Sequence, residues 1–101
     1  MPRYGFVVNF EARPGQEEAV RQFLVDAKPM VDAEPGTFAW FSFQSGPSTF
    51  GIFDAFETEA DREFHLNGEV RKTIDRRNDE LFASAPTITP VDLIATKLPL
   101  Q

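Results

Sequence analysis

The chain contains a single histidine, His65, and this side chain is the first candidate for proton transfer. An imidazole titrates near neutral pH, so it can accept and release a proton under physiological conditions. Asp61 precedes His65 by one helical turn, and its carboxylate can orient the ring or stabilise its positive charge. The same spacing occurs in ordinary surface ion pairs, so two interpretations stay open: a catalytic base and an exposed helix residue.

Two polar residues interrupt segments that are otherwise apolar. Asn9 lies in "YGFVVNF", where its amide can hydrogen-bond a substrate oxygen at any pH or satisfy a backbone group. Asp54 lies in "FGIFDAF", and burial would raise the pKa of its carboxyl enough for it to act as a base. Because buried carboxylates usually have a charged partner, we favour a pair with an arginine at a subunit interface.

Three further side chains are candidates for substrate binding. Trp40 and Phe56 offer flat apolar surfaces, although aromatic residues of this kind also serve as core, and a buried indole N–H needs an acceptor. Arg77 lies beside the apolar stripe of a predicted helix, where it would hold an anionic substrate at a cavity edge or extend into solvent.

The elements that must position these residues can be read from the apolar periodicity. Strands are predicted at 3–12, 37–44, 49–57 and 91–98, and helices within 13–34, at 59–67 and at 69–83. Pro29 predicts a kink or a restart in the first helix. Thr58 is a predicted N-cap, and Gly68 is placed where the second helix stops. The order of elements indicates an α+β, ferredoxin-like split βαβ fold with a four-stranded antiparallel sheet.

Composition limits the class of protein. With 101 residues, 1–101 is expected to be one domain, and 42% hydrophobic residues with eleven phenylalanines can build a core. A net charge of −6 disfavours nucleic acid and anionic membranes as partners. The lack of cysteine excludes disulfides and thiolate chemistry. The absence of an N-terminal apolar run argues against export or membrane insertion, so a cytoplasmic protein is expected.

Two of the predicted strands are apolar on both faces. The strand at 37–44 has Phe38 and Trp40 on one face and Phe41 and Phe43 on the other. Helices can cover only one face of a four-stranded sheet, so we expect a homodimer formed through the sheet faces. The alternative is that loops or the C-terminal segment cover the second face.

The segments "EPGTFAWFSF" and "FGIFDAFETEADREFHLNG", with the order of elements, resemble the antibiotic biosynthesis monooxygenase family of dimeric α+β barrels. The resemblance implies a monooxygenase without flavin, metal or other cofactor, which oxidises an electron-rich aromatic (a quinol, anthrone or polyketide type) with dioxygen. It places His65 as the proton acceptor in a cavity between sheet and helices. Asn9 corresponds to an asparagine used by haem-degrading relatives. Phe56 and Ile52 stand where relatives of known activity carry tryptophan and asparagine.

Other functions stay open beside this one. The same dimeric scaffold is compatible with a non-catalytic small-molecule-binding or stress-responsive protein. A haem-degrading monooxygenase with His65 as axial ligand is a less favoured alternative.

Overall fold

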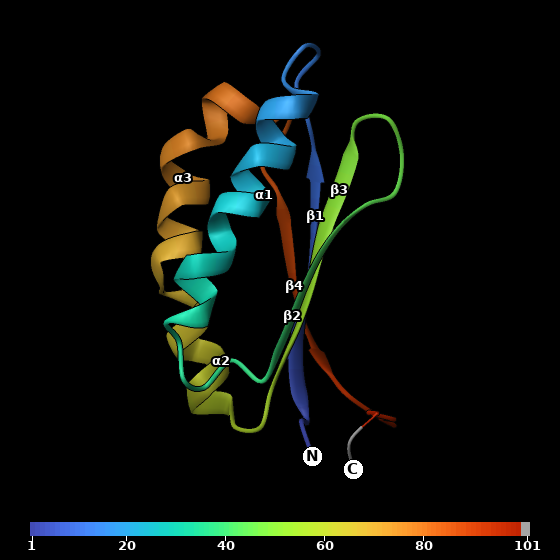
Figure 1. The fold of residues 1–101 in the computed structure, drawn as a ribbon, viewed down its shortest axis with the longest axis vertical. Helices are drawn as coiled ribbons and strands as arrows, with labels where there is room; N and C mark the ends of the chain where they lie inside the picture. Colours follow the sequence, from blue (N-terminus) through green and yellow to red (C-terminus); the bar gives the residue numbers. More distant parts are fainter. Residues whose placement is uncertain (100–101) are drawn as a thin grey trace.

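The computed structural model describes residues 1–99 and places three helices on one face of a four-stranded sheet (Figure 1). The elements follow the predicted order: β1 Tyr4–Glu11, α1 Glu17–Asp32, β2 Ala39–Gln44, β3 Thr49–Phe56, α2 Glu59–Leu66, α3 Glu69–Leu81 and β4 Thr87–Asp92. The strands lie in the order β2-β3-β1-β4, and every neighbouring pair is antiparallel. The predicted α+β ferredoxin-like fold is confirmed.

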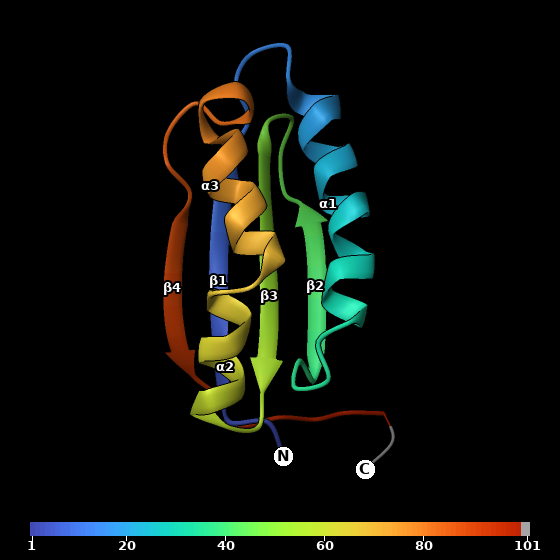
Figure 2. The same cartoon turned by 90° about the vertical axis from the view of Figure 1, so that its left-hand side faces the viewer.

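The helix layer divides into two parts. Figure 2 looks onto this layer: α2 and α3 run over β1 and β3, and α1 runs along the side of the sheet formed by β2. Thr58 caps α2 as predicted, because its hydroxyl accepts a hydrogen bond from the Asp61 N–H at 3.1 Å. Gly68 separates α2 from α3 and serves as the N-cap of α3. The two short helices are therefore held close together above the centre of the sheet.

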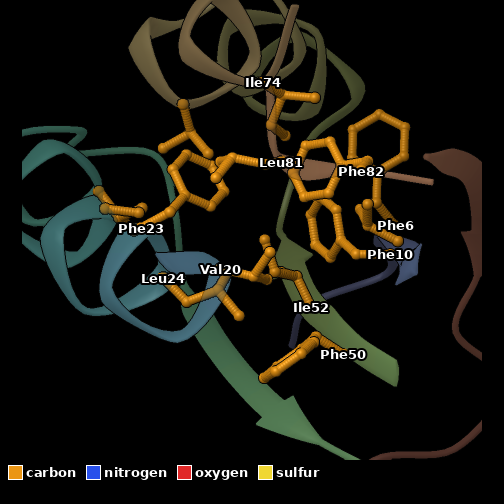
Figure 3. Close-up of a cluster of buried hydrophobic side chains, with 14 of the residues drawn as sticks. Phe6, Phe10, Val20, Phe23, Leu24, Phe50, Ile52, Ile74, Leu81 and Phe82 are labelled. Carbon is orange, nitrogen blue, oxygen red and sulfur yellow. The ribbon is translucent and has the colours of Figure 1, made fainter. Parts of the chain in front are cut away.

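The core lies between the sheet and the helices. Phe6, Val8 and Phe10 alternate along β1 toward the helices and are buried, because successive residues of a strand point to opposite faces. Figure 3 shows phenylalanine rings from the sheet meeting rings from the helix layer. Phe10 stacks on Phe82 with ring centroids 5.1 Å apart. This packing fixes which face of each strand is internal.

The last strand differs from the prediction. A strand was expected at 91–98, but β4 runs over Thr87–Asp92, and the segment 93–99 has no regular structure. Pro90 lies inside β4, opposite Phe6. A proline is tolerated there because β4 is an edge strand, so its missing N–H interrupts no second ladder. The apolar residues from Leu93 onward suggest a strand in the sequence, but they follow β4 and do not belong to it.

The first helix also differs in detail. Pro29 does not restart α1, which continues to Asp32. The buried residues of α1 follow the predicted helical spacing; they are Val20, Phe23, Leu24, Ala27 and Val31.

The second face of the sheet carries no helix (Figure 1). Phe41 and Phe43 on this face are 59% and 43% exposed. The segment 93–99 crosses only one end of the sheet, where Leu93 and Leu98 line a cavity with Phe53. The alternative that the C-terminal segment covers this face holds for that end alone. Within residues 1–99, no helix has the length and apolarity needed to cross a membrane.

Candidate functional site

His65 is a buried residue of α2. Its side chain is 9% exposed, and its ring lies 5.2 Å from the ring of Phe56, centroid to centroid. The cap at Thr58 sets the start of α2 and therefore the direction in which His65 points, toward the sheet. The interpretation of His65 as an exposed helix residue is wrong.

Both ring nitrogens of His65 meet a carboxylate. Nδ1 lies 2.5 Å from Oε1 of Glu34, and Nε2 lies 3.0 Å from Oδ2 of Asp54. The expected partner, Asp61, is instead turned toward Gly36 in the turn after α1, and both ring nitrogens are occupied by Glu34 and Asp54. A histidine between two buried carboxylates is the central feature of the site, called the Glu34–His65–Asp54 cluster below.

Asp54 is fixed from the sheet side. It is 1% exposed, and its Oδ1 accepts a hydrogen bond of 3.1 Å from the Phe6 N–H of the neighbouring strand. Its Oδ2 meets the ion-pair distance to His65, but the direction of this contact is not that of a hydrogen bond. Within residues 1–99, Oδ2 is therefore a buried oxygen without a hydrogen-bond donor. The expected arginine partner at a subunit interface is wrong, because alternation along β3 turns Asp54 toward the helices.

Glu34 was not predicted from the sequence. It lies in the turn after α1, where its N–H donates to the Val31 carbonyl at 2.9 Å and its Oε1 accepts from the Thr37 hydroxyl at 2.7 Å. Its side chain is 7% exposed. The only local signal was the following Pro35-Gly36, which indicates a turn and says nothing about a partner 31 residues away.

The surroundings of His65 alter its acid–base behaviour. Burial by itself lowers the pKa of the imidazole, but the close contacts with the carboxylates of Asp54 and Glu34 and their negative charges outweigh burial. The net result is a pKa of His65 raised above its ordinary value of 6.5. The cluster therefore favours the imidazolium, which is the form that a base becomes when it has accepted a proton.

A small cavity adjoins the Asp54 end of the cluster. Its volume is about 30 Å³, and apart from Asp54, His65 and Arg71 its lining is apolar: Phe6, Val8, Ile52, Leu66, Val70, Ile74 and Ile88. This is the layer in which a substrate cavity was expected. The space is that of about one water molecule. Its rim is formed by Leu66, Arg71 and Ile88, which are only partly buried.

A larger groove lies at the Glu34 end of the cluster. It measures about 730 Å³ and is lined by the end of α1, by α2 and by the start of α3. Met30, Ala33, Ala60 and Phe64 form its apolar part, and Glu34 forms part of its wall. The Glu34–His65–Asp54 cluster thus lies between two spaces of very different size.

The comparison with protein families decides the classification. The family model described as antibiotic biosynthesis monooxygenase matches residues 3–77, which include all three members of the cluster. The chain belongs to the antibiotic biosynthesis monooxygenase family. No curated protein matches this family member at a significant level.

Solved structures agree with the family. The crystal structure of NE2512, a protein of unknown function from Nitrosomonas europaea, is 46% identical, covers 100% of this chain and 98% of its own, and has a TM-score of 0.95. PA3566 from Pseudomonas aeruginosa is 22% identical over 94% of this chain and 97% of its own, with a TM-score of 0.80. Rv0793 from Mycobacterium tuberculosis is 16% identical over 93% and 97%, with a TM-score of 0.82. The latter two show the shared fold.

In this family member, the structure does not bring Asn9 to the cluster. Asn9 is exposed on the helix-free face of β1, because Val8 and Phe10 on either side of it point into the core. A site that uses Asn9 and His65 together is excluded within one protomer.

The predicted aromatic residues take different places. Phe56 is fully buried beside His65 and does not line the small cavity. Trp40 faces the helices from β2, opposite Asp54 in the register, and lines a pocket of about 240 Å³ with Glu34 and Thr37. Among residues 1–99, the indole Nε1 of Trp40 is also buried without a hydrogen-bond partner. Trp40 therefore lies near the Glu34–His65–Asp54 cluster. Phe56 packs against the His65 ring of this cluster.

Arg77 does not reach the cavity. Its guanidinium forms hydrogen bonds of 3.0 and 3.2 Å with the carboxylate of Glu80 on the same helix. Arg71, which is six residues earlier on α3, lines the cavity and was not predicted. The cationic side chain next to the site is therefore Arg71.

The donor set does not suit haem or another metal centre. Carboxylate oxygens lie 2.5 and 3.0 Å from the two ring nitrogens of His65, which leaves no room for iron beside either nitrogen, and the adjoining cavity of about 30 Å³ is far smaller than a porphyrin. Within the described part of the chain, no three histidine, aspartate or glutamate side chains converge in an arrangement able to hold a metal ion.

Proposed function

We propose that this chain is a monooxygenase that uses no cofactor and oxidises an electron-rich aromatic of the quinol, anthrone or polyketide type with dioxygen. The observation that carries the proposal is the buried Asp54 Oδ2, which lacks a hydrogen-bond donor, beside His65 and an apolar cavity. A substrate hydroxyl supplies the missing donor. Family membership supports the reaction class.

The protein's part in the reaction is proton transfer and exclusion of water. Neutral His65 takes the acidic proton of the substrate at Nε2, and the two carboxylates stabilise the resulting imidazolium. The apolar walls keep water from the substrate anion, which makes it a stronger reductant. The anion then reduces dioxygen: one oxygen atom enters the substrate, which loses two electrons and two protons, and the other oxygen leaves as water.

An aromatic ring needs more room than the cavity of about 30 Å³ provides. The partly buried rim residues Leu66, Arg71 and Ile88 are the ones that must move, because the floor of the cavity belongs to the sheet. Entry therefore occurs between the α2–α3 junction and β4. A flat substrate enters by displacing these side chains.

The helix-free face of the sheet supports a homodimer. Phe41 and Phe43 are each at least 43% exposed there, beside half-buried Val7 and Phe53. A patch of this kind is a liability for a monomer, and each phenylalanine removed from water contributes roughly 1.5–3 kcal/mol. The occupant proposed for this face is the same face of a second copy.

The test is oxygen uptake in metal-free buffer with a panel of anthrones and hydroquinones. The wild type is compared with Asp54→Asn, His65→Gln and the control Asp32→Asn, which alters only an exposed ion pair. We expect uptake to fall by about 10²- to 10⁴-fold in the first two variants, the usual contribution of acid–base catalysis, and to be unchanged in the control. Circular dichroism checks that each variant is folded. Equal rates in all four proteins contradict the proposal.

A second function is favoured by one observation. The groove of about 730 Å³ outside α2 has the size of a small-molecule site, whereas the inner cavity does not. A non-catalytic binding protein would use this groove. Protection of the fold by a ligand without oxygen uptake, and loss of that protection in Phe64→Ala but not in Asp54→Asn, would identify this function instead.

A further inference from the structure

We propose that Glu34 is a positioning residue that holds the proton of neutral His65 on Nδ1, so that Nε2 is the nitrogen that exchanges protons at the inner cavity. The catalytic consequence of this inference rests on the proposed function. The inference about the histidine itself does not. Neither local sequence pattern nor family membership assigns a role to Glu34.

The two contacts of the imidazole are unequal. Glu34 Oε1 lies 2.5 Å from Nδ1 in a hydrogen bond, whereas Asp54 Oδ2 lies 3.0 Å from Nε2 without hydrogen-bond direction. A carboxylate accepts hydrogen bonds and does not donate them. When the ring holds one proton, that proton is therefore more stable on the side of Glu34. Nε2 is left as a lone pair beside the cavity.

The position of Glu34 is itself fixed by its neighbours. The turn after α1 is closed by hydrogen bonds from the N–H of Glu34 and from the N–H of Thr37, and the Thr37 hydroxyl holds Oε1. Gly68 leaves the space that the carboxylate occupies, since a Cβ on this residue would lie 2.7 Å from Oε2 of Glu34. The α2–α3 junction and the turn after α1 are thus shaped to fit one carboxylate.

Few other charges face the imidazole. From β3 the facing group is Asp54, from the turn after α1 it is Glu34, and α3 contributes Arg71 at the same cavity. Within residues 1–99, β1 and β4 present only apolar side chains to this cavity. On α2 itself, Asp61 lies one turn earlier and is turned toward Gly36. Glu34 and Asp54 therefore dominate the acid–base behaviour of His65.

The experiment uses the fact that His65 is the only histidine, so that its nitrogen signals in NMR spectra need no assignment. The ring is labelled with ¹⁵N, and the tautomer and the pKa are followed through a pH titration. In the wild type we expect the neutral ring to carry its proton on Nδ1. In Glu34→Gln we expect a mixture with more of the Nε2–H form and a lower pKa of His65.

A second variant separates position from charge. Gly68→Ala keeps every charge but places a Cβ against the Glu34 carboxylate, and the φ angle of −87° at this position allows alanine. We expect the same change of tautomer as in Glu34→Gln, but smaller. The matched control is Glu63→Gln, which removes an exposed glutamate from the same groove on α2 without touching His65. A tautomer unchanged in both test variants overturns the inference, and Gly68→Ala provides the result if Glu34→Gln does not fold.

The link to catalysis is tested by the pH profile of oxygen uptake. Glu34→Gln should shift the ascending limb to lower pH and reduce the maximal rate about tenfold or more, because part of the acid–base contribution is lost. Absence of uptake in every protein, with the tautomer change present, refutes the proposed function and leaves the role of Glu34 intact. Uptake with an unshifted profile in Glu34→Gln refutes the role of Glu34 in catalysis.

Discussion

The two faces of the sheet are formed by the same strands, but a polar residue is buried on one face and exposed on the other. On the helix-covered face, Asp54 is buried, accepts a backbone hydrogen bond and meets His65. On the open face, Asn9 is exposed among phenylalanines that are exposed as well. The difference shows that an apolar strand does not reveal which of its faces is covered. Within one protomer, the polar strand residue that meets His65 is Asp54 on the helix-covered face, whereas Asn9 points away from it.

The largest expected effect is on the covered face. Phe56→Ala should destabilise the protein by about 3–5 kcal/mol, because the ring is fully buried against Phe6 and His65. Phe41→Ala on the open face should change the stability of the protomer by less than about 1 kcal/mol. Urea unfolding at low protein concentration measures both. Equal losses would show that the two faces are equally covered in the protomer.

The next effect concerns the open face alone. Replacing Phe41 and Phe43 together with aspartate should convert a dimer of twice 11.4 kDa into a monomer of 11.4 kDa, because buried carboxylates would face one another across the interface. Light scattering coupled to size-exclusion chromatography measures the mass. A monomeric wild type at micromolar concentration would contradict the proposed homodimer.

A smaller effect arises from the titration of His65. Folding raises the pKa of His65, so binding of its proton stabilises the folded state. This contribution is complete below the ordinary pKa of 6.5 and is lost as the pH rises through the pKa of the folded state. The urea midpoint of the wild type should therefore fall across this interval. In His65→Gln the same interval should show no such fall, and an equal fall would assign the dependence to other groups.

The smallest effect belongs to the solvent-exposed side of the helices. Asp32→Asn removes the ion pair with Lys28, in which both side chains are more than 60% exposed. We expect a loss of about 0.2–0.5 kcal/mol, which salt reduces further. Urea unfolding at low and high salt measures this loss of stability. The losses in Asp54→Asn and Glu34→Gln can then be compared with it.

The fold could be predicted because its signals are local. Alternation along "YGFVVNFE" and helical spacing from Val20 to Val31 each extend over a few neighbouring residues, and they identify strand and helix without tertiary information. The start of β4 at Thr87 was harder to predict from the sequence. Pro86 and Pro90 were interpreted as bracketing the approach to a strand that begins at Val91, and only the edge position of β4 in the sheet explains why Pro90 is accommodated inside it.

The site was predictable only in part. His65 and Asp54 stood out as polar residues in apolar surroundings, but their contact depends on how α2 lies over β3. Glu34 is distant in sequence from both, so its role required the folded turn after α1. The volume of the cavity depends on side chains from β1, β3, β4, α2 and α3 together, which no segment of the sequence encodes alone.

The most direct test of the account is the pH dependence of oxygen uptake by the wild-type protein with the best substrate of the panel. Because the proposed base is the neutral imidazole, the rate should rise with pH along a limb centred above 6.5, and this limb should disappear in His65→Gln. A rate that does not vary with pH in this range, or a limb that persists without the imidazole, would contradict proton transfer at His65.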